Sequence, residues 1–383
     1  MQEGKRGNIG LNGNTAALAV DRALGELRRG RSIAVVEPGS VFVFAAIETV
    51  GSQVLERLIE ASDAPELLLT ADRARAAGLA PEAVGPVSLA IRGKAELDSL
   101  KALAGLASGA PAPAPAANFG TWRGDDRLAL AAFGLAKAAR LVPALVGFAT
   151  RTVTDDSLEA VPLEAVLEHA AGATGGIRLI SESRVPLAGA ESSRVALFRD
   201  EHGGSEHVAV IIGEPDLSAS VPVRLHSACL TGDLLGSLRC DCGEQLKAAV
   251  GRIAGLGGGI LLYLDQEGRS IGLANKLRAY AIQDEGVDTY EADRHLGFSS
   301  DERSYDVAAA MLQQIGVTRV RLLTNNPQKI DALREHGIDV DGRLPLVSQP
   351  NEHNAGYLRA KRELAGHLSE ESGQDGATPG TLE

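Results

Sequence analysis

The stretch that decides the organisation of this chain runs from Arg224 to Gln245 and reads RLHSACLTGDLLGSLRCDCGEQ. It contains every cysteine of the 383-residue chain, namely Cys229, Cys240 and Cys242. Three thiolates so close together can hold a zinc ion while its fourth coordination position stays open, as in catalytic zinc sites. Zinc in such a site lowers the pKa of a bound water to about 7, which supplies hydroxide at neutral pH. The spacing therefore predicts a catalytic zinc centre.

The three cysteines allow two other interpretations. A disulfide is disfavoured because the count is odd and the N-terminus lacks the apolar core of a signal peptide. A structural zinc site completed by the nearby His226 has a suitable spacing, and the sequence leaves this alternative open.

Length and composition bound the remaining classes of function. A chain of 383 residues with 44% hydrophobic residues is typical of a globular protein with two or three domains. The net charge of −12 and the aromatic content of 3% argue against a nucleic-acid partner, since phosphate backbones attract basic surfaces and single strands stack on aromatic rings. No uncharged apolar run reaches about 18 residues, so we expect no membrane-spanning helix. We expect a cytoplasmic protein.

Strands alternate with helices after residue 190, which predicts an α/β fold with a mixed sheet. An antiparallel hairpin of strands 194–198 and 207–212 opens this half. We expect further strands at 260–264 and 320–323 and helices at 243–254, 271–281, 303–315, 327–335 and 352–367. In the first half we expect helices at 21–29, 54–61, 128–145 and 159–171 and strands at 32–36, 41–47 and 67–69. The Pro- and Ala-rich segment 107–117 is predicted to be a linker.

Cationic side chains gather after residue 220 in this acidic chain, several of them at loop–helix junctions. They are Arg224, Arg239, Arg269, Lys276, Arg278, Arg303 and Lys329. The runs 266–269 and 324–327 each follow an apolar strand and precede a helix. Ligands of open α/β sheets collect at such carboxyl ends of strands, and phosphates bind helix N-termini and arginines there. The pattern indicates a phosphorylated ligand, although each cation alone is compatible with a surface ion pair.

Three further side chains have two interpretations each. Glu267 either pairs with Arg269 or reads the N–H edge of a purine. Asp301 either caps the helix expected from Arg303 or takes part in chemistry. Tyr280 lies at the edge of the core or donates a proton near the metal.

Four motifs in fixed order closely resemble the GTP cyclohydrolase II family, which performs the first committed step of riboflavin synthesis. They are HSACLTGDLLGSLRCDCGEQL, QEGRSIGLANKLRAYAIQD, HLGFSSDER and RLLTNNPQK. The resemblance covers residues 190–367. It implies opening of the guanine imidazole ring of GTP, release of formate and pyrophosphate, and 2,5-diamino-6-(5-phosphoribosylamino)pyrimidin-4-one as the product. It also implies one Zn²⁺ per subunit, Mg²⁺ with the triphosphate, and a homodimer.

The same resemblance implies roles for individual residues. Zinc would sit on Cys229, Cys240 and Cys242. The substrate site would comprise Arg224, Leu225, His226, Ser227, Ala228, Gln245, Glu267, Gly268, Arg269, Thr289, Thr324 and Lys329. Asp301 would be the general base, Tyr280 would assist at the ring, and Arg303 would be a nucleophile toward the α-phosphate. Since arginine is essentially always protonated, clamping that phosphate is an equally good role for Arg303. Many family members carry Glu in place of Ala228, and Arg or Asn in place of Asp265, which affects fine substrate contacts only.

The first half, residues 15–185, more weakly resembles dihydroxybutanone phosphate synthase through VDRALGELRRGRSIAVVE and LAKAARLVPALV. That family holds magnesium and a sugar phosphate with an acidic run after its first strand. Here the place has a single carboxylate, Glu37, so we expect a degenerate, non-catalytic domain. The expected organisation is therefore this domain, a catalytic domain at 190–367 and a disordered tail at 368–383. A bifunctional fusion and a nucleotide-binding regulator with structural zinc are the alternatives.

Overall fold

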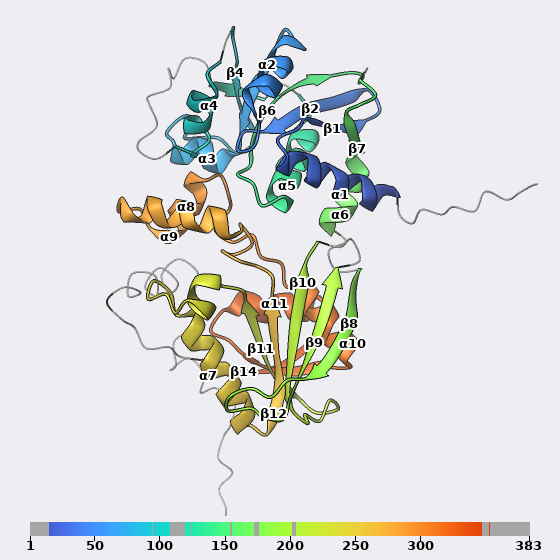
Figure 1. The fold of residues 1–383 in the computed structure, drawn as a ribbon, viewed down its shortest axis with the longest axis vertical. Helices are drawn as coiled ribbons and strands as arrows, with labels where there is room; N and C mark the ends of the chain where they lie inside the picture. Colours follow the sequence, from blue (N-terminus) through green and yellow to red (C-terminus); the bar gives the residue numbers. More distant parts are fainter. Residues whose placement is uncertain are drawn as a thin grey trace, which may run out of the picture. The chain divides into compact units, whose positions relative to one another are not determined.

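The computed structural model describes residues 15–346 and 352, except residues 94, 108–118, 123, 154, 172–175 and 201–203. The chain divides into two compact units, Met1–Ala171 and Gly172–Glu383, each built on a seven-stranded sheet (Figure 1). The expected linker, last helix and tail fall outside the described residues, apart from Ala107 and Glu352. None of the described helices is both long and apolar enough to cross a membrane.

The first unit has a largely antiparallel sheet with the strand order β5-β4-β3-β6-β2-β1-β7. Its strands are β1 (Ile33–Glu37), β2 (Ser40–Ala46), β3 (Glu66–Leu69), β4 (Val87–Ala90), β5 (Phe119–Thr121), β6 (Ala144–Thr150) and β7 (Glu159–Pro162). Its helices are α1 (Thr15–Arg28), α2 (Ser52–Glu60), α3 (Ala71–Ala76), α4 (Leu97–Leu103), α5 (Asp126–Ala138) and α6 (Leu163–Ala171). Residues of α1, α5 and α6 pack with Phe42 and Phe44 of β2 in one core. Among the described strands of this unit, only β1 and β7 pair in parallel.

Two helices expected in this unit are shorter than the sequence suggested. The helix expected to continue to residue 145 ends at Ala138, and Ala144–Thr150 is instead β6, paired with β2 and β3. Pro143 separates them, since proline has no N–H to donate to a helix. The helix expected from Glu159 begins at Leu163, because the preceding residues pair with β1 as β7. Tertiary pairing overrides helix propensity in both segments.

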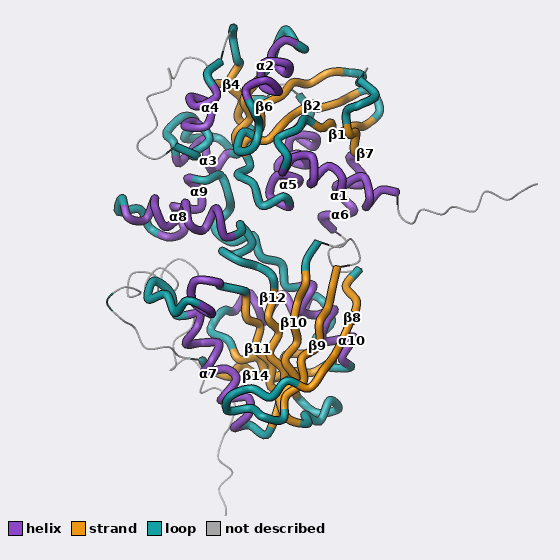
Figure 2. Tube along the Cα trace, viewed as in Figure 1, coloured by secondary structure: helices purple, strands orange, loops and turns teal. Residues whose placement is uncertain are grey.

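The second unit has a mixed sheet with the order β14-β13-β11-β12-β10-β9-β8 (Figure 2). Its strands are β8 (Ile177–Arg184), β9 (Ser193–Asp200), β10 (Glu206–Gly213), β11 (Val221–Ser227), β12 (Gly258–Leu264), β13 (Arg319–Leu323) and β14 (Asp339–Leu344). Its helices are α7 (Cys242–Gly255), α8 (Leu273–Asp284), α9 (Thr289–His295), α10 (Asp306–Ile315) and α11 (Pro327–Glu335), with a π-helical turn at Leu230–Leu234. Strand β8 pairs with β9, so residues 177–184 belong to this unit.

Alternating side chains give this sheet a core on each face. Ile260 and Leu262 of β12 pack with residues of α10 and α11, whereas Leu261 between them packs with Ala249 and Ile253 of α7. Successive side chains of a strand point to opposite faces, and each fully buried aliphatic side chain contributes about 1.5–3 kcal/mol. Strand β12 therefore contributes to the cores on both faces of the sheet, and this packing fixes the position of the carboxyl end of the strand.

The parallel part of the sheet creates a crevice at one edge. Strand β11 pairs in parallel with β12 on one side and with β13 on the other. The chain leaves β11 toward β12 and later returns to the opposite side, which makes β11 a topological switch point. Loops that follow such neighbouring strands diverge and leave room for a ligand. The loops after β11, β12 and β13 carry the motifs singled out in the sequence.

Candidate active site

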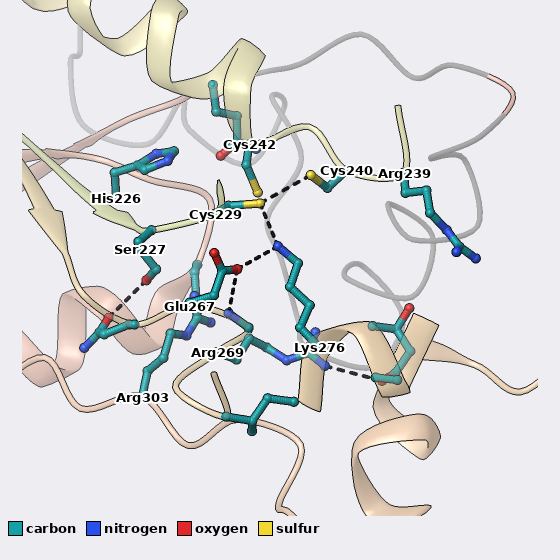
Figure 3. Close-up of a pocket in the computed structure, with 18 of the residues that line it drawn as sticks. His226, Ser227, Cys229, Arg239, Cys240, Cys242, Glu267, Arg269, Lys276 and Arg303 are labelled. Carbon is teal, nitrogen blue, oxygen red and sulfur yellow. Dashed lines mark hydrogen bonds and ion pairs between the residues drawn. The ribbon is translucent and has the colours of Figure 1, made fainter. Parts of the chain in front are cut away.

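The three cysteines converge at the carboxyl end of β11. Cys229 is the second residue after the strand, Cys242 is the first residue of α7, and Cys240 lies two residues before that helix (Figure 3). Their sulfur atoms lie within 4.8 Å of one another. A Cβ atom added to Gly232 would stand 2.8 Å from Cys240 Sγ and 3.0 Å from Cys229 Sγ. The backbone of the π-helical turn thus covers the sulfurs so closely that a larger residue would displace them.

The chemistry of this donor set fits zinc. Hydrogen bonds with Cys240 and Cys242, and then with Lys276, hold the pKa of Cys229 well below its usual range. The hydrogen bond with Cys229 in turn raises the pKa of Cys240. The cluster therefore holds one thiolate readily, and a bound cation would deprotonate the others. Three sulfurs match the ligand number of catalytic zinc sites.

Buried polar groups next to the cysteines fix the loop that carries Cys229. Asp233 accepts hydrogen bonds from the backbone N–H of Cys229 at 3.0 Å and from the Tyr263 hydroxyl at 3.0 Å. His226 Nε2 lies 3.0 Å from Asp233 Oδ1, and burial lowers the pKa of this imidazole. Among the described residues the metal-binding group comprises the three cysteines and not His226. The structure therefore disfavours the four-ligand alternative.

Glu267, in the loop after β12, is held by the protein itself. One oxygen, Oε2, accepts from the backbone N–H of Leu230 at 2.6 Å. The other, Oε1, accepts from Lys276 Nζ at 2.7 Å and from the N–H of Gly268 at 3.1 Å. Of the two interpretations of Glu267, the pair with Arg269 is therefore wrong: the ion pair of Glu267 is with Lys276, and Arg269 pairs with Asp293.

The backbone at Arg269 has an unusual, left-handed conformation. Its φ is +61° and that of Ser270 is +76°, a left-handed region that side chains rarely adopt and that often marks functional sites. The guanidinium pairs with Asp293 of α9, a carboxylate that is only 1% exposed. Burial raises the pKa of Asp293 to about 6, although Arg269 acts in the opposite direction. Sequence reasoning missed Asp293, because nothing in its local pattern points to a distant arginine.

Two buried cations tie the ends of the parallel strands together. Arg224 of β11 donates from Nη1 to the carbonyl of Leu323 at 2.9 Å and from Nη2 to Gln245 Oε1 at 2.6 Å. Lys329 of α11 donates to the carbonyl of Leu225 at 2.8 Å. Burial lowers the pKa of Arg224 to about 10, so it stays charged at neutral pH. Both cations are preorganised to receive an anion.

Asp301 and Arg303 lie in the loop before α10, which begins at Asp306 rather than at the expected Arg303. Asp301 therefore caps no helix. It accepts instead from the backbone N–H of Arg303 at 3.0 Å and from its side chain. Burial favours the neutral acid, but the bonds and charge of Arg303 outweigh it and lower the pKa of Asp301.

Tyr280 of α8 lies on the metal side of the crevice. The guanidinium of Arg239 stands over its ring, 4.7 Å from the centroid. Burial raises the pKa of Tyr280, so the phenol keeps its proton at neutral pH. Tyr280 is half-buried and lines the pocket, so the structure is compatible with both interpretations of this residue.

These groups line one pocket. Every residue predicted for the site lines it except Leu225, which is buried in the core, and Asp301, which lies behind Arg303. Six cationic side chains line the pocket against the carboxylates of Glu267 and Asp293, although the chain as a whole is acidic. Sequence reasoning gave no individual site role to the other polar lining residues, which are Arg239 and Lys276 (named only in the cation group), Gln266 (named only in the run 266–269), Gln283, Asp293, Asn325 and Asn326. The run TNNP did carry a signal for the two asparagines.

Comparison with known proteins gives one consistent family. The family model described as GTP cyclohydrolase II matches residues 178–345. GTP cyclohydrolase-2 of Azospirillum brasilense is 43% identical over 363 residues, which cover 92% of this chain and 94% of that protein. GTP cyclohydrolase-2 of Shewanella amazonensis is 52% identical over 176 residues, 45% of this chain and 85% of that protein. A solved two-domain 3,4-dihydroxy-2-butanone 4-phosphate synthase from A. baumannii aligns with 86% of this chain and 99% of its own, but its TM-score of 0.29 and identity of 12% are too low to show a shared fold.

Proposed function

The chain belongs to the GTP cyclohydrolase II family, and from this premise we propose that it is a zinc-dependent enzyme that opens the imidazole ring of GTP. Formate and pyrophosphate leave, and the product is 2,5-diamino-6-(5-phosphoribosylamino)pyrimidin-4-one, at the first step of riboflavin synthesis. The observation that carries this proposal is the placement of three convergent sulfurs and six cations in one pocket. A guanine at the sulfurs and a triphosphate at the cations would use both features.

Cys229, Cys240 and Cys242 would hold the zinc. Zinc bound by three protein ligands supplies an activated water at neutral pH, which is the nucleophile that ring opening requires. Tyr280, which keeps its proton, would donate at the ring as negative charge develops there. Asp233 and Tyr263 would keep the cysteine loop in place, because their hydrogen bonds end on the backbone of Cys229 and on one another.

The cationic side of the pocket would bind the triphosphate with Mg²⁺. Arg224 and Lys329 are already anchored to backbone carbonyls, so little side-chain entropy remains to be lost on binding. Arg303 would clamp the α-phosphate, since a guanidinium that is always protonated is a poor nucleophile. Asp301 would serve as a base once Arg303 has turned toward phosphate.

The first unit would not be a synthase. Glu37 has Asp125 and Glu164 nearby, and the hydrogen bond with Asp125 is the main cause that raises its pKa. However, the guanidinium of Arg127 already pairs with Glu37 at 3.3 Å and with Glu164 at 3.4 Å. Glu48 accepts from the backbone N–H of Val142 at 2.8 Å. The guanidinium of Arg127 thus already neutralises Glu37 and Glu164, which disfavours binding of a divalent metal by these two carboxylates.

The function is tested by incubating the full-length protein with GTP, zinc and magnesium and measuring formate, pyrophosphate and the diaminopyrimidine. We expect the three products in equal amounts. GTP consumption without formate, or no consumption by zinc-loaded protein, would contradict the proposal.

A further inference from the structure

The ammonium of Lys276 joins the cysteine cluster to the loop after β12. Its Nζ lies 3.0 Å from Cys229 Sγ and 2.7 Å from Glu267 Oε1 (Figure 3). The residue is only 8% exposed. A buried ammonium is costly unless groups of opposite charge surround it, and here a thiolate and a carboxylate do so.

Glu267 completes a closed ring of contacts. Its second oxygen accepts from the backbone N–H of Leu230, the residue that follows Cys229. Lys276 therefore holds Cys229 through its sulfur. The carboxylate of Glu267, which the same ammonium binds, holds the next residue, Leu230. Loss of Lys276 would leave a buried carboxylate without its charge partner and would remove the only ammonium that the described residues place on this sulfur, which would keep the backbone N–H of Gly232 at 3.3 Å as a donor.

The position of Lys276 is fixed by close packing. Gly268 has a φ of +63°, and a Cβ atom there would stand 3.0 Å from Lys276 Cβ. The backbone N–H of Lys276 bonds the carbonyl of Gly272 in the first turn of α8. The loop therefore folds directly against the helix, and the lysine side chain has little freedom to leave the ring of contacts.

We propose that Lys276 is a positioning residue that locks the Cys229 thiolate and the Glu267 carboxylate into one rigid arrangement, which retains the metal and keeps the substrate loop in register with it. The proposal rests on the proposed zinc-dependent function. Groups that bond to metal ligands commonly change metal affinity by about 10–100-fold when removed.

The test measures the rate at which zinc leaves the protein for a chromogenic chelator. Lys276→Met keeps the length and removes the charge, and we expect it to release zinc at least about tenfold faster than the wild type. Lys276→Arg keeps the charge and should release zinc more slowly than Lys276→Met. The matched control is Lys329→Met, because Lys329 is equally buried in the same pocket but donates to a backbone carbonyl. It should raise the KM for GTP and release zinc at the wild-type rate.

Release at the wild-type rate from Lys276→Met would overturn the proposal, and so would equal acceleration in both methionine variants. Should Lys276→Met fail to fold, as judged by thermal melting, Glu267→Gln removes the charge partner and should also accelerate release; an unchanged rate there would overturn the proposal. Zinc release is measured without GTP. A wild-type protein that retains zinc but does not open GTP would therefore contradict the proposed function alone.

Discussion

The guanidinium of Arg303 folds back onto the carboxylate of Asp301, with Nε 2.8 Å from Oδ1 and Nη2 2.5 Å from Oδ2. Both side chains are mostly buried, so the pair is only weakly screened by water. The hydrogen bonds and charge of Arg303 lower the pKa of Asp301, so the carboxylate is a weaker base while the guanidinium stays in this position. If Asp301 is the base proposed above, a triphosphate that draws Arg303 away would release it, and phosphate binding would then be coupled to proton transfer.

Replacing Arg303 with alanine tests the role of Arg303 at the phosphate. We expect Arg303→Ala to keep its zinc and to lower kcat/KM for GTP by about 100-fold or more, the usual cost of removing one charge-stabilising donor. The measurement is formate release together with zinc content. Arg278→Ala is the control, because Arg278 bonds Asn275 on α8 outside the pocket lining and should stay within about threefold of the wild type. Equal loss in both variants would remove the specific role of Arg303.

A methyl group at Gly232 should disturb the cysteine cluster. Gly232→Ala places its Cβ against two sulfurs, so we expect weaker zinc retention and lower thermal stability. Gly251→Ala is the matched control: this α7 glycine has nothing within 4 Å of an added Cβ. Alanine there should stabilise by about 0.4–1 kcal/mol. Unchanged zinc content in Gly232→Ala would show that the sulfurs are not covered as described.

Asp293 should make stability fall as pH rises. Its folded pKa of about 6 lies above the ordinary value of 3.8. Between these values the native state holds the proton that the unfolded state has lost, so stability declines as the pH rises through this window and levels off above it. We expect the free energy of unfolding of the wild type, relative to Asp293→Asn, to decrease by about 2 kcal/mol from pH 4 to pH 7. Thermal or urea unfolding across this range checks the sign, and a rising difference would contradict it.

The first unit should show no synthase activity. Rearrangement of a sugar phosphate through an enediolate needs a metal held by several carboxylates, because the developing negative charge must be neutralised. Here Arg127 occupies two of them. With ribulose 5-phosphate and magnesium we expect no dihydroxybutanone phosphate. Turnover at a rate comparable with that of the GTP reaction would refute this assignment.

The sequence picked out residues that the fold brings together, although it did not predict every strand that positions them. Cysteine spacing and polar runs after apolar strands are local signals, and the residues they pointed to lie together at the ends of β11, β12 and β13. Strand β11 was not recognised, although it carries Arg224 to Ser227. Its apolar run is short, and only its pairing with β12 and β13 makes it a strand.

The pairings within the site could not be read from the sequence. Lys276 meets a cysteine 47 positions away, and Arg269 meets Asp293 24 positions away. A carboxylate or an ammonium has the same local pattern whether it pairs with a neighbour or with a distant residue. The nearest residue of opposite charge is therefore the natural partner to consider. For Glu267 and Arg269 that pairing is wrong, because the turn at Gly268 separates their side chains and each pairs with another residue.

The most direct test of the account is a zinc titration of GTP ring opening. The protein is stripped with a chelator, zinc is added back in steps, and formate release is followed together with bound zinc, with Cys240→Ser measured in parallel. We predict that formate release rises in proportion to bound zinc up to one ion per chain, and that Cys240→Ser neither retains zinc nor releases formate. Full formate release by demonstrably metal-free protein would contradict the central claim.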